Sequence, residues 1–242
     1  MKNLTFFFCF CLLSPTLSTT LSAQQRFTGG LFGGINFAQI DGDFQQGYRK
    51  KMFGGGIRAA MILTRKFDIG TELMYNGKGA EPSATDKASR NPNFFMTMHY
   101  AEAALTANLH FDQNEEGFNQ KTVQIGLSYG RLLSSSNEIS KLSQIDTFKG
   151  KQFLQENIKN VDVSLLFGFA YRFTPKIGIA IRHTYSLTPF FERVIVQTSR
   201  VTPNPKDYYI ARSYFLSVHL FYDLWAPELR KPKKARKKKV NG

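Results

Sequence analysis

The chain has 242 residues, which allows one large all-β domain or two small ones, and it carries a formal net charge of +14, from 32 Lys and Arg against 18 Asp and Glu. No stretch approaches the roughly 20 apolar residues that a membrane helix needs, so a helical membrane protein is not expected.

The first 23 residues are expected to form a secretory signal peptide rather than part of the fold. Lys2 supplies a positive start, residues 4–13 (LTFFFCFCLL) form an apolar core of signal-peptide length, and residues 21–23 (LSA) offer a cleavage site. The alternative, a short membrane anchor, is disfavoured because Ser14 and Pro15 end the apolar run too early.

Both cysteines, Cys9 and Cys11, lie inside this leader and lack the small residues that a lipoprotein cleavage site places before its cysteine. The mature protein is therefore expected to have no disulfide, no thiol nucleophile and no thiolate metal site.

Downstream of the leader, apolar and polar residues alternate with period two, the pattern of strands with one apolar face. In the third segment, one face carries Phe67, Ile69, Thr71, Leu73 and Tyr75. The expected strands, in chain order, are residues 26–39, 52–63, 67–79, 100–111, 122–132, 161–173, 177–187 and 214–224. Phe32 is a misfit in the first, and the alanines of the fourth leave a helix open for that segment alone.

The connections between these strands alternate long, short, long, short, long, short, long. Outer-membrane barrels have an even strand number, short periplasmic turns and long outer loops, and their strands of about 9 to 11 residues cross the bilayer at a tilt. We therefore predict an all-β fold, an eight-stranded antiparallel up-and-down transmembrane β-barrel over residues 24–225. A soluble lipocalin-like barrel is the alternative.

Several runs also resemble the PorT-like outer-membrane β-barrel (porin family) proteins of Bacteroidetes: GGLFGGINFAQIDGD (29–43), TELMYNGKGA (71–80), HYAEAALTANLHF (99–111), GLSYGRLL (126–133) and AIRHTYSL (180–187). The resemblance spans nearly the whole mature chain and implies an outer-membrane location and a closed barrel. It implies little about activity, and the founding member's role in type IX secretion and gliding cannot be transferred residue by residue. One departure is Ala104, where the family usually has proline.

Four charged residues fall on the polar faces of their strands near mid-length, and we expect them to form a network that plugs the barrel: Arg58, Glu72, Glu102 and Arg182. Arg58 and Glu72 are equidistant from the turn at residue 65 and should sit opposite each other. Glu102 would be an uncompensated neighbour of Glu72, and Arg182 from the far wall would reach both carboxylates. Arg182→Ala is then expected to raise the conductance from near zero.

No catalytic constellation is recognisable, so an enzyme is not expected, and neither is a cofactor or a metal site. His110 and His219 are expected to line the barrel near its periplasmic end, and His183 to lie at the outer lipid interface.

The C-terminal residues 226–242 form a polybasic tail that supplies half of the net charge, since eight basic residues minus Glu228 give +7. The basic residues are Arg230, Lys231, Lys233, Lys234, Arg236, Lys237, Lys238 and Lys239. The tail is either a solvated, disordered segment or an electrostatic tether to anionic envelope partners or lipid head groups. Behind a signal peptide it is not expected to meet nucleic acid.

With an even strand number, both termini are expected in the periplasm, the loops near residues 46, 86, 146 and 198 outside, and the turns near 65, 116 and 175 in the periplasm. Two functions remain open. One is a non-enzymatic structural or secretion-associated envelope component that contacts outer-membrane lipid and other envelope proteins. The other is a narrow small-solute channel, which the filled interior of an eight-stranded barrel disfavours.

Overall fold

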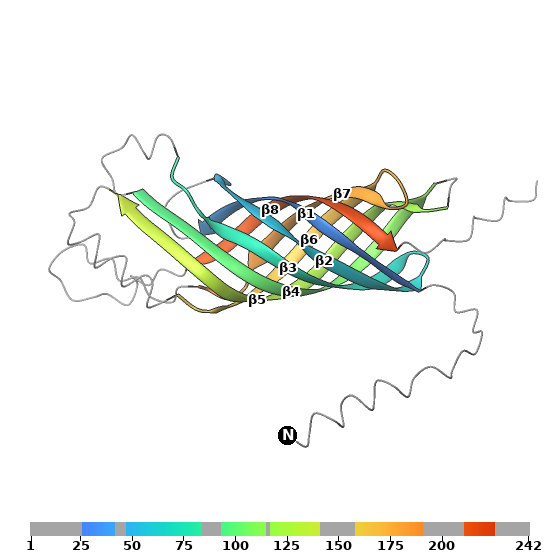
Figure 1. Ribbon diagram of the computed structural model, residues 1–242, viewed down its shortest axis with the longest axis horizontal. Coiled ribbons are helices and arrows are strands. Elements are labelled where there is room, and N and C mark those ends of the chain that lie inside the picture. The colour runs from blue at the N-terminus through green and yellow to red at the C-terminus, as the bar shows by residue number, and fades with distance from the viewer. Residues whose placement is uncertain are drawn as a thin grey trace, which may run out of the picture.

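A computed structural model describes residues 26–41, 47–83, 93–114, 117–140, 158–190 and 211–225. These residues form a single closed barrel of eight antiparallel strands, each paired with its sequence neighbours and β1 paired with β8 (Figure 1). The strands are β1 (Phe27–Asp41), β2 (Lys50–Thr64), β3 (Phe67–Ala80), β4 (Asn93–Gln113), β5 (Asn119–Ser140), β6 (Val161–Arg172), β7 (Ile177–Ser186) and β8 (Arg212–Trp225). The predicted fold class is confirmed.

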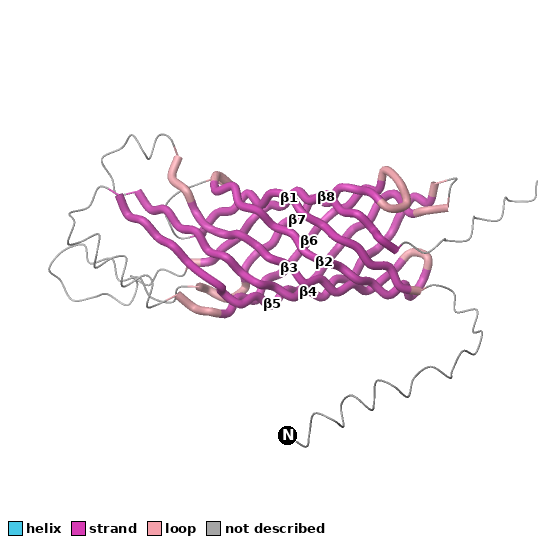
Figure 2. Tube along the Cα trace, viewed as in Figure 1, coloured by secondary structure: helices cyan, strands magenta, loops and turns pink. Residues whose placement is uncertain are grey.

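The fourth segment is a strand throughout, so the helix that its alanines left open is wrong (Figure 2). Ala103 and Ala107 of β4 face outward, beside Leu73 and Ile69 of β3, where the alternation had placed them. β4 and β5 are also much longer than expected, at 21 and 22 residues. They run past the rest of the barrel at one end, where polar residues of the expected loops continue the pairing from Ser134 to Ser140.

The two ends of the barrel differ. At one, here the turn end, β2 joins β3 and β6 joins β7 through short turns, and β4 joins β5 through residues 114–118. At the other, the long-loop end, four wider connections join the remaining strand pairs. Positions 46, 86, 116, 146 and 198, which the sequence placed in connections, lie outside the described residues.

No helix in the described part of the chain is long and apolar enough to cross a membrane.

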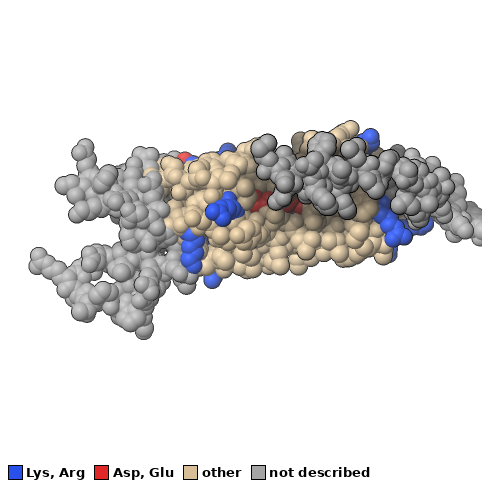
Figure 3. All heavy atoms as spheres, turned by 60° about the horizontal axis from the view of Figure 1, so that its bottom comes forward, with Lys and Arg blue, Asp and Glu red and all other residues tan. Residues whose placement is uncertain are grey.

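The outward-facing positions of the strands are apolar between the two ends. Along β8 they are Tyr214, Leu216, Val218, Leu220, Tyr222 and Leu224, and along the middle of β5 they include Ile125, Leu127 and Tyr129, followed by Arg131 toward the long-loop end. Leu220, Leu224 and Phe27 are each more than 60% exposed. Figure 3 shows one such lateral face, mainly uncharged, with Lys and Arg toward the two ends. A water-facing surface of this kind would be costly, whereas a hydrocarbon environment matches it.

Candidate functional site in the barrel interior

Most of the inward-facing positions are polar, and their side chains form two networks stacked along the barrel. The turn-side network comprises Arg58, Asp68, Glu72, Asn108, His110, Gln124, Arg172, Arg182 and Asp223. The loop-side network comprises Asn36, Asn76, Lys78, Glu102, Asp162, Ser164, Ser186 and His219. Each network draws side chains from strands far apart in the sequence.

Arg182 of β7 crosses the interior to Glu72 of β3. Its two terminal nitrogens donate to the two carboxylate oxygens at 2.6 and 2.7 Å, and its Nε donates to Gln124 Oε1 at 3.0 Å. Both charged side chains are 3% exposed. Gly168, directly opposite Arg182 on β6, leaves the necessary room, because a Cβ there would lie 2.8 Å from Arg182 Cγ. Fork-to-fork pairing of this kind satisfies both charges and fixes their geometry.

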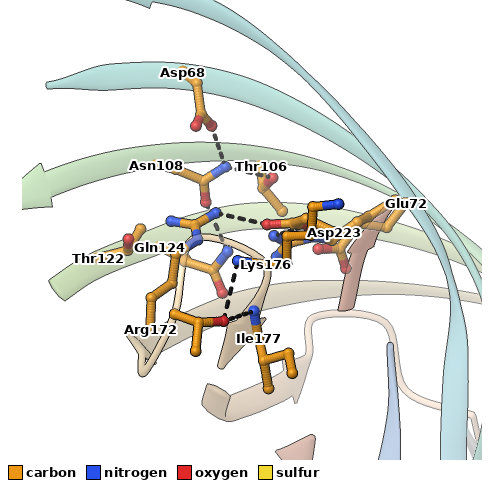
Figure 4. A network of polar contacts seen from close by, with 12 residues as sticks. Asp68, Glu72, Thr106, Asn108, Thr122, Gln124, Arg172, Lys176, Ile177 and Asp223 are labelled. Carbon is orange, nitrogen blue, oxygen red and sulfur yellow. Dashed lines mark hydrogen bonds and ion pairs between the residues drawn. The ribbon is translucent and has the colours of Figure 1, made fainter. Parts of the chain in front are cut away.

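From Gln124 the turn-side network continues toward the turn end. Gln124 donates to Asn108, which donates to Asp68 at 2.6 Å (Figure 4). Asp68 also contacts His110 Nε2 at 2.6 Å, and the other ring nitrogen of His110 lies 2.8 Å from the Thr122 hydroxyl. The Asp68 carboxylate is therefore buried with two side-chain hydrogen-bond partners rather than alone.

A second cross-strand pair joins β2 to β8. Arg58 donates through Nη2 and Nε to Asp223 Oδ1 at 2.5 and 3.0 Å, and Arg172 of β6 lies 3.2 Å from the other oxygen. Gly30 of β1 lies between the two strands, opposite both Arg58 and Asp223. Because Gly30 has no side chain, the guanidinium can pass over β1, with its Cζ 4.3 Å from the centre of the Phe221 ring.

Lys78 organises the loop-side network. Its Nζ lies 2.6 Å from Glu102 Oε1 and also contacts Asp162 Oδ2, and all three side chains are at most 4% exposed. Glu102 and Asp162 are both opposite Gly130, on either side of β5. A Cβ at Gly130 would lie 3.0 Å from Glu102 Cγ, so glycine again occupies the gap between charged neighbours.

Asparagines extend this network across the barrel. Asn76 donates to Glu102 at 2.8 Å and accepts from Asn36 at 3.0 Å, and His219 Nε2 lies 3.3 Å from Asn36 Oδ1. His219 pairs with Ala180 and Gly34 near mid-barrel, so its expected position near the turn end is wrong. Only His110 lies near that end.

Apolar side chains separate and cap the networks. Phe32, the misfit of the sequence pattern, is buried inside with Met74, Ala104, Ala170, Ala180 and Phe221. Its ring lies 5.4 Å from His219 and 5.2 Å from the Arg182 guanidinium. At the long-loop end, the cap consists of Ile40, Ala80, Met96, Met98, Tyr100, Ile158, Phe190 and Ala211. The interior is thus filled by alternating polar and apolar layers.

The charges inside nearly balance. The two networks contain the cations Arg58, Lys78, Arg172 and Arg182 and the carboxylates of Asp68, Glu72, Glu102, Asp162 and Asp223. Asp68, the carboxylate without a Lys or Arg contact in the described chain, has His110 and Asn108 instead. Near-neutral pairing with hydrogen bonds is the condition under which buried charges are tolerated.

The structure revises the expected network. Arg182 does contact Glu72, and Arg58 does lie opposite Glu72 in register, but the Arg58 side chain turns to Asp223. Arg182 does not bridge to Glu102, which is compensated by Lys78 instead.

Sequence reasoning missed five charged members of the two networks, which are Asp68, Lys78, Asp162, Arg172 and Asp223. They lie near the ends of their strands, whereas the prediction was confined to charged residues near mid-length. The inward-facing glycines Gly30 and Gly130 were the available signal, since each lies between two charged positions on its neighbouring strands.

Little space remains inside. A cavity of about 30 Å³ in the turn-side network is lined by Arg58, Glu72 and Thr106, among others. A second, of about 60 Å³, opens near Arg65 and Pro175 at the turn end. A buried water molecule needs roughly 10 to 15 Å³ of cavity, so these spaces suit a few waters rather than a solute.

No group of three or more His, Cys, Asp or Glu side chains that could hold a metal occurs in the described ranges. Inside the barrel, the buried charges pair with one another, as Arg182 does with Glu72 and Lys78 with Glu102. The expected tether residues, from Arg230 to Lys239, and the expected leader, residues 1–23, lie outside the described part of the chain.

Solved structures similar to the chain include Neisserial surface protein A, at 12% identity and a TM-score of 0.37, covering 81% of this chain and 96% of that one. Ail of Yersinia pestis, in complex with the heparin analogue sucrose octasulfate, matches at 11% identity and a TM-score of 0.38, covering 82% and 99%. OprG of Pseudomonas aeruginosa matches at 9% identity and a TM-score of 0.35, covering 83% and 95%.

No curated protein matches the sequence. The family model described as "Outer membrane protein beta-barrel domain" matches residues 22–192, well over half of the chain. With the closed eight-stranded barrel and its apolar exterior, this match means that the chain belongs to the outer membrane protein β-barrel domain family and is a transmembrane β-barrel of the Gram-negative outer membrane.

Proposed function

We propose that the protein is a non-enzymatic envelope component, a structural or secretion-associated barrel of the PorT-like type that acts through its surfaces and termini. The observation that carries this proposal is the filled interior. The Arg182–Glu72 pair crosses the barrel, the loop-side network lies beyond it, and an apolar cap closes the long-loop end. A barrel filled in this way has no room inside for a substrate or a wide water path.

The proposed orientation puts the long-loop end outside the cell and both termini in the periplasm. Support comes from the alternation of short turns and wide connections, which outer-membrane barrels show in this sense. In this orientation, the basic tail after Trp225 would meet periplasmic or inner-leaflet anionic partners.

Planar-bilayer recording of the purified protein tests the closed interior. We expect conductance near zero, because the two networks and the apolar cap lie in series. Removal of Arg182 alone is no longer expected to open a path, since the Lys78 network and the cap remain. Large, stable conductance of the unmodified protein would favour the narrow small-solute channel instead.

Partner identification tests the envelope role. Affinity capture from native outer membranes, with mass spectrometry of what co-purifies, should return other envelope or secretion proteins. The same capture with residues 230–242 deleted would separate partners bound through the tail from partners bound through the barrel. Recovery of the barrel alone in both samples would contradict the proposal.

A further inference from the structure

We propose that the lipid-facing side of β7 and β8 at the long-loop end carries a binding site for the phosphorylated sugar headgroup of an outer-leaflet glycolipid. The residues are Tyr48, His183, Tyr185, Arg212 and Tyr214, here the Arg212 site. The choice of leaflet rests on the proposed orientation.

The site begins with a cluster of rings outside the barrel wall. The Tyr214 ring lies 5.4 Å from Tyr48, 6.2 Å from His183 and 6.4 Å from Tyr185. The Tyr48 hydroxyl and His183 Nε2 are 3.0 Å apart, which links the first wide connection to β7. His183 therefore lies on the apolar outer face, as the alternation indicated, where it contacts Tyr48 and Tyr214.

Arg212 adds a cation to this cluster, and most of its hydrogen-bond donors have no partner in the described chain. Within the described chain, its hydrogen bonding is limited to Nη1, which lies 3.5 Å from the Tyr185 hydroxyl, the outer limit of a hydrogen bond. Its Nε has no hydrogen-bond partner in the described chain. Asp41 is opposite Arg212 in the β1–β8 register, yet the two form no ion pair. A guanidinium with unused donors matches the oxygens of a phosphate.

The height of the site fits a lipid headgroup. Tyr214 and Tyr222 lie eight residues apart on the same face of β8, with Leu216, Val218 and Leu220 between them. At about 3.4 Å per residue and a tilt of about 40°, they are separated by roughly 21 Å across the membrane, close to the ~25 Å between aromatic girdles. Arg212 lies two residues beyond Tyr214, at the level where charged headgroups begin.

The chemistry favours a phosphorylated sugar over a plain phospholipid. Aromatic rings that are apolar on the face and polar at the edge can pack against the C–H face of a pyranose while their hydroxyls remain at the wet interface. The guanidinium beside them then pairs with the phosphate. A phosphodiester lipid without a sugar would use Arg212 and leave the rings unengaged.

Arg131 offers a matched control. It also faces outward at the long-loop end, two residues beyond an exposed tyrosine, Tyr129, but no ring contact of Tyr129 or Arg131 is present in the described chain. A generic attraction between rim cations and anionic lipid would affect both arginines alike. Binding at a specific site formed by the ring cluster and Arg212 would depend on Arg212 and not on Arg131.

The test is lipid binding by the purified full-length mature protein in neutral detergent, measured by native mass spectrometry. The probe is a bis-phosphorylated, acylated glucosamine disaccharide, compared with its dephosphorylated form and with phosphatidylglycerol. Arg212→Gln should weaken binding of the phosphorylated probe about tenfold, as expected for loss of a charge-assisted contact. Arg131→Gln should change it less than about twofold, and Asp41→Asn should strengthen it.

Equal losses in Arg212→Gln and Arg131→Gln, undiminished binding of the dephosphorylated probe, or equal affinity for phosphatidylglycerol would each overturn the site. Heat-modifiable migration should be unchanged in all three variants and confirms folding. Because binding in detergent does not depend on which side of the membrane the site faces, failure here is distinct from failure of the proposed orientation, which cysteine labelling tests separately.

Discussion

At the scale of single residues, the interior is built from long charged side chains that reach over glycines. Gly30 lies between Arg58 and Asp223, and Gly130 between Glu102 and Asp162. Glycine normally weakens a strand. Here the missing side chain leaves the volume that a neighbouring guanidinium or carboxylate fills, so the interior glycines are part of the charge network.

Gly30→Ala should destabilise the barrel by about 1 to 3 kcal/mol, the usual cost of overpacking. An alanine Cβ there would clash with the Tyr222 carbonyl oxygen and lie 2.9 Å from both Cα and Oδ1 of Asp223, so the β8 backbone and the Asp223 side chain would both have to shift. The measurement is urea unfolding in lipid vesicles. Gly33→Ala is the matched control on the same strand, because its Cβ would face outward at an ordinary 3.5 Å from the Phe53 ring. Equal effects of the two changes would contradict a role for the interior gap.

Arg182→Ala should cost about 3 to 5 kcal/mol, because it leaves the Glu72 carboxylate buried without its guanidinium. The double variant Arg182→Met with Glu72→Leu should have a free energy of unfolding much closer to that of the unmodified protein, since it removes both charges together. Unfolding in urea measures both. A loss below about 1 kcal/mol for the single change would mean that water or another side chain reaches Glu72.

At the scale of elements, β5 divides into two parts. From Lys121 to Arg131 it pairs with both β4 and β6. Beyond Leu132, whose amide donates to the Asn160 carbonyl, the described pairing is with β4 alone. A strand paired on one side has less protection against local opening than one paired on both sides.

Backbone amides of Ser134 to Ser136 should therefore exchange with solvent at least about 100-fold faster than those of Ile125 to Leu127. Hydrogen exchange followed by NMR of the protein in lipid nanodiscs measures the difference. The corresponding central and outer residues of β4, Leu105 and Thr97, provide an internal comparison. Equal protection along β5 would show that another segment covers its outer edge.

The alternation in the sequence was sufficient to predict all eight strands and their order, because the apolar outer face imposes period two on each. It also predicted that Arg182 and Glu72 share the interior. Alternation carries no information on where a long side chain turns, so it could not separate Glu72 from Asp223 as the partner of Arg58. The strand extension through Ser134–Ser140 was missed because polar residues outside the apolar belt lose the two-faced pattern.

At the scale of the whole molecule, orientation decides which surfaces meet which partners. The expected mature chain contains no cysteine, so single-cysteine labelling is unambiguous. A membrane-impermeant maleimide on intact cells should label a cysteine at position 86 and not one at position 65, which lies in the β2–β3 turn. Labelling of lysed cells controls for reactivity. Labelling of position 65 but not 86 in intact cells would invert the proposed topology.

Deletion of residues 230–242 should leave the barrel intact, because β8 ends at Trp225. Heat-modifiable migration on gels measures this. If the tail is a tether, the association of the full-length protein with envelope components should weaken as the salt concentration rises, since exposed charges are screened within about 10 Å at 0.1 M salt. Removal of the tail should abolish this salt-sensitive association. Association that is insensitive to salt, or unchanged by the deletion, would exclude the tether.

The Arg58–Asp223 pair joins residues 165 positions apart in the sequence, across the seam where β1 meets β8. In an open sheet inserted before that seam forms, Arg58 on β2 and Asp223 on β8 would lie near opposite edges, so their ion pair would be missing in a low-dielectric surrounding, and Asp223 would keep Arg172 alone as a cation partner. The open sheet is thereby destabilised relative to the finished barrel. Closure of the last seam and neutralisation of these charges are one event, which makes assembly in the bilayer cooperative.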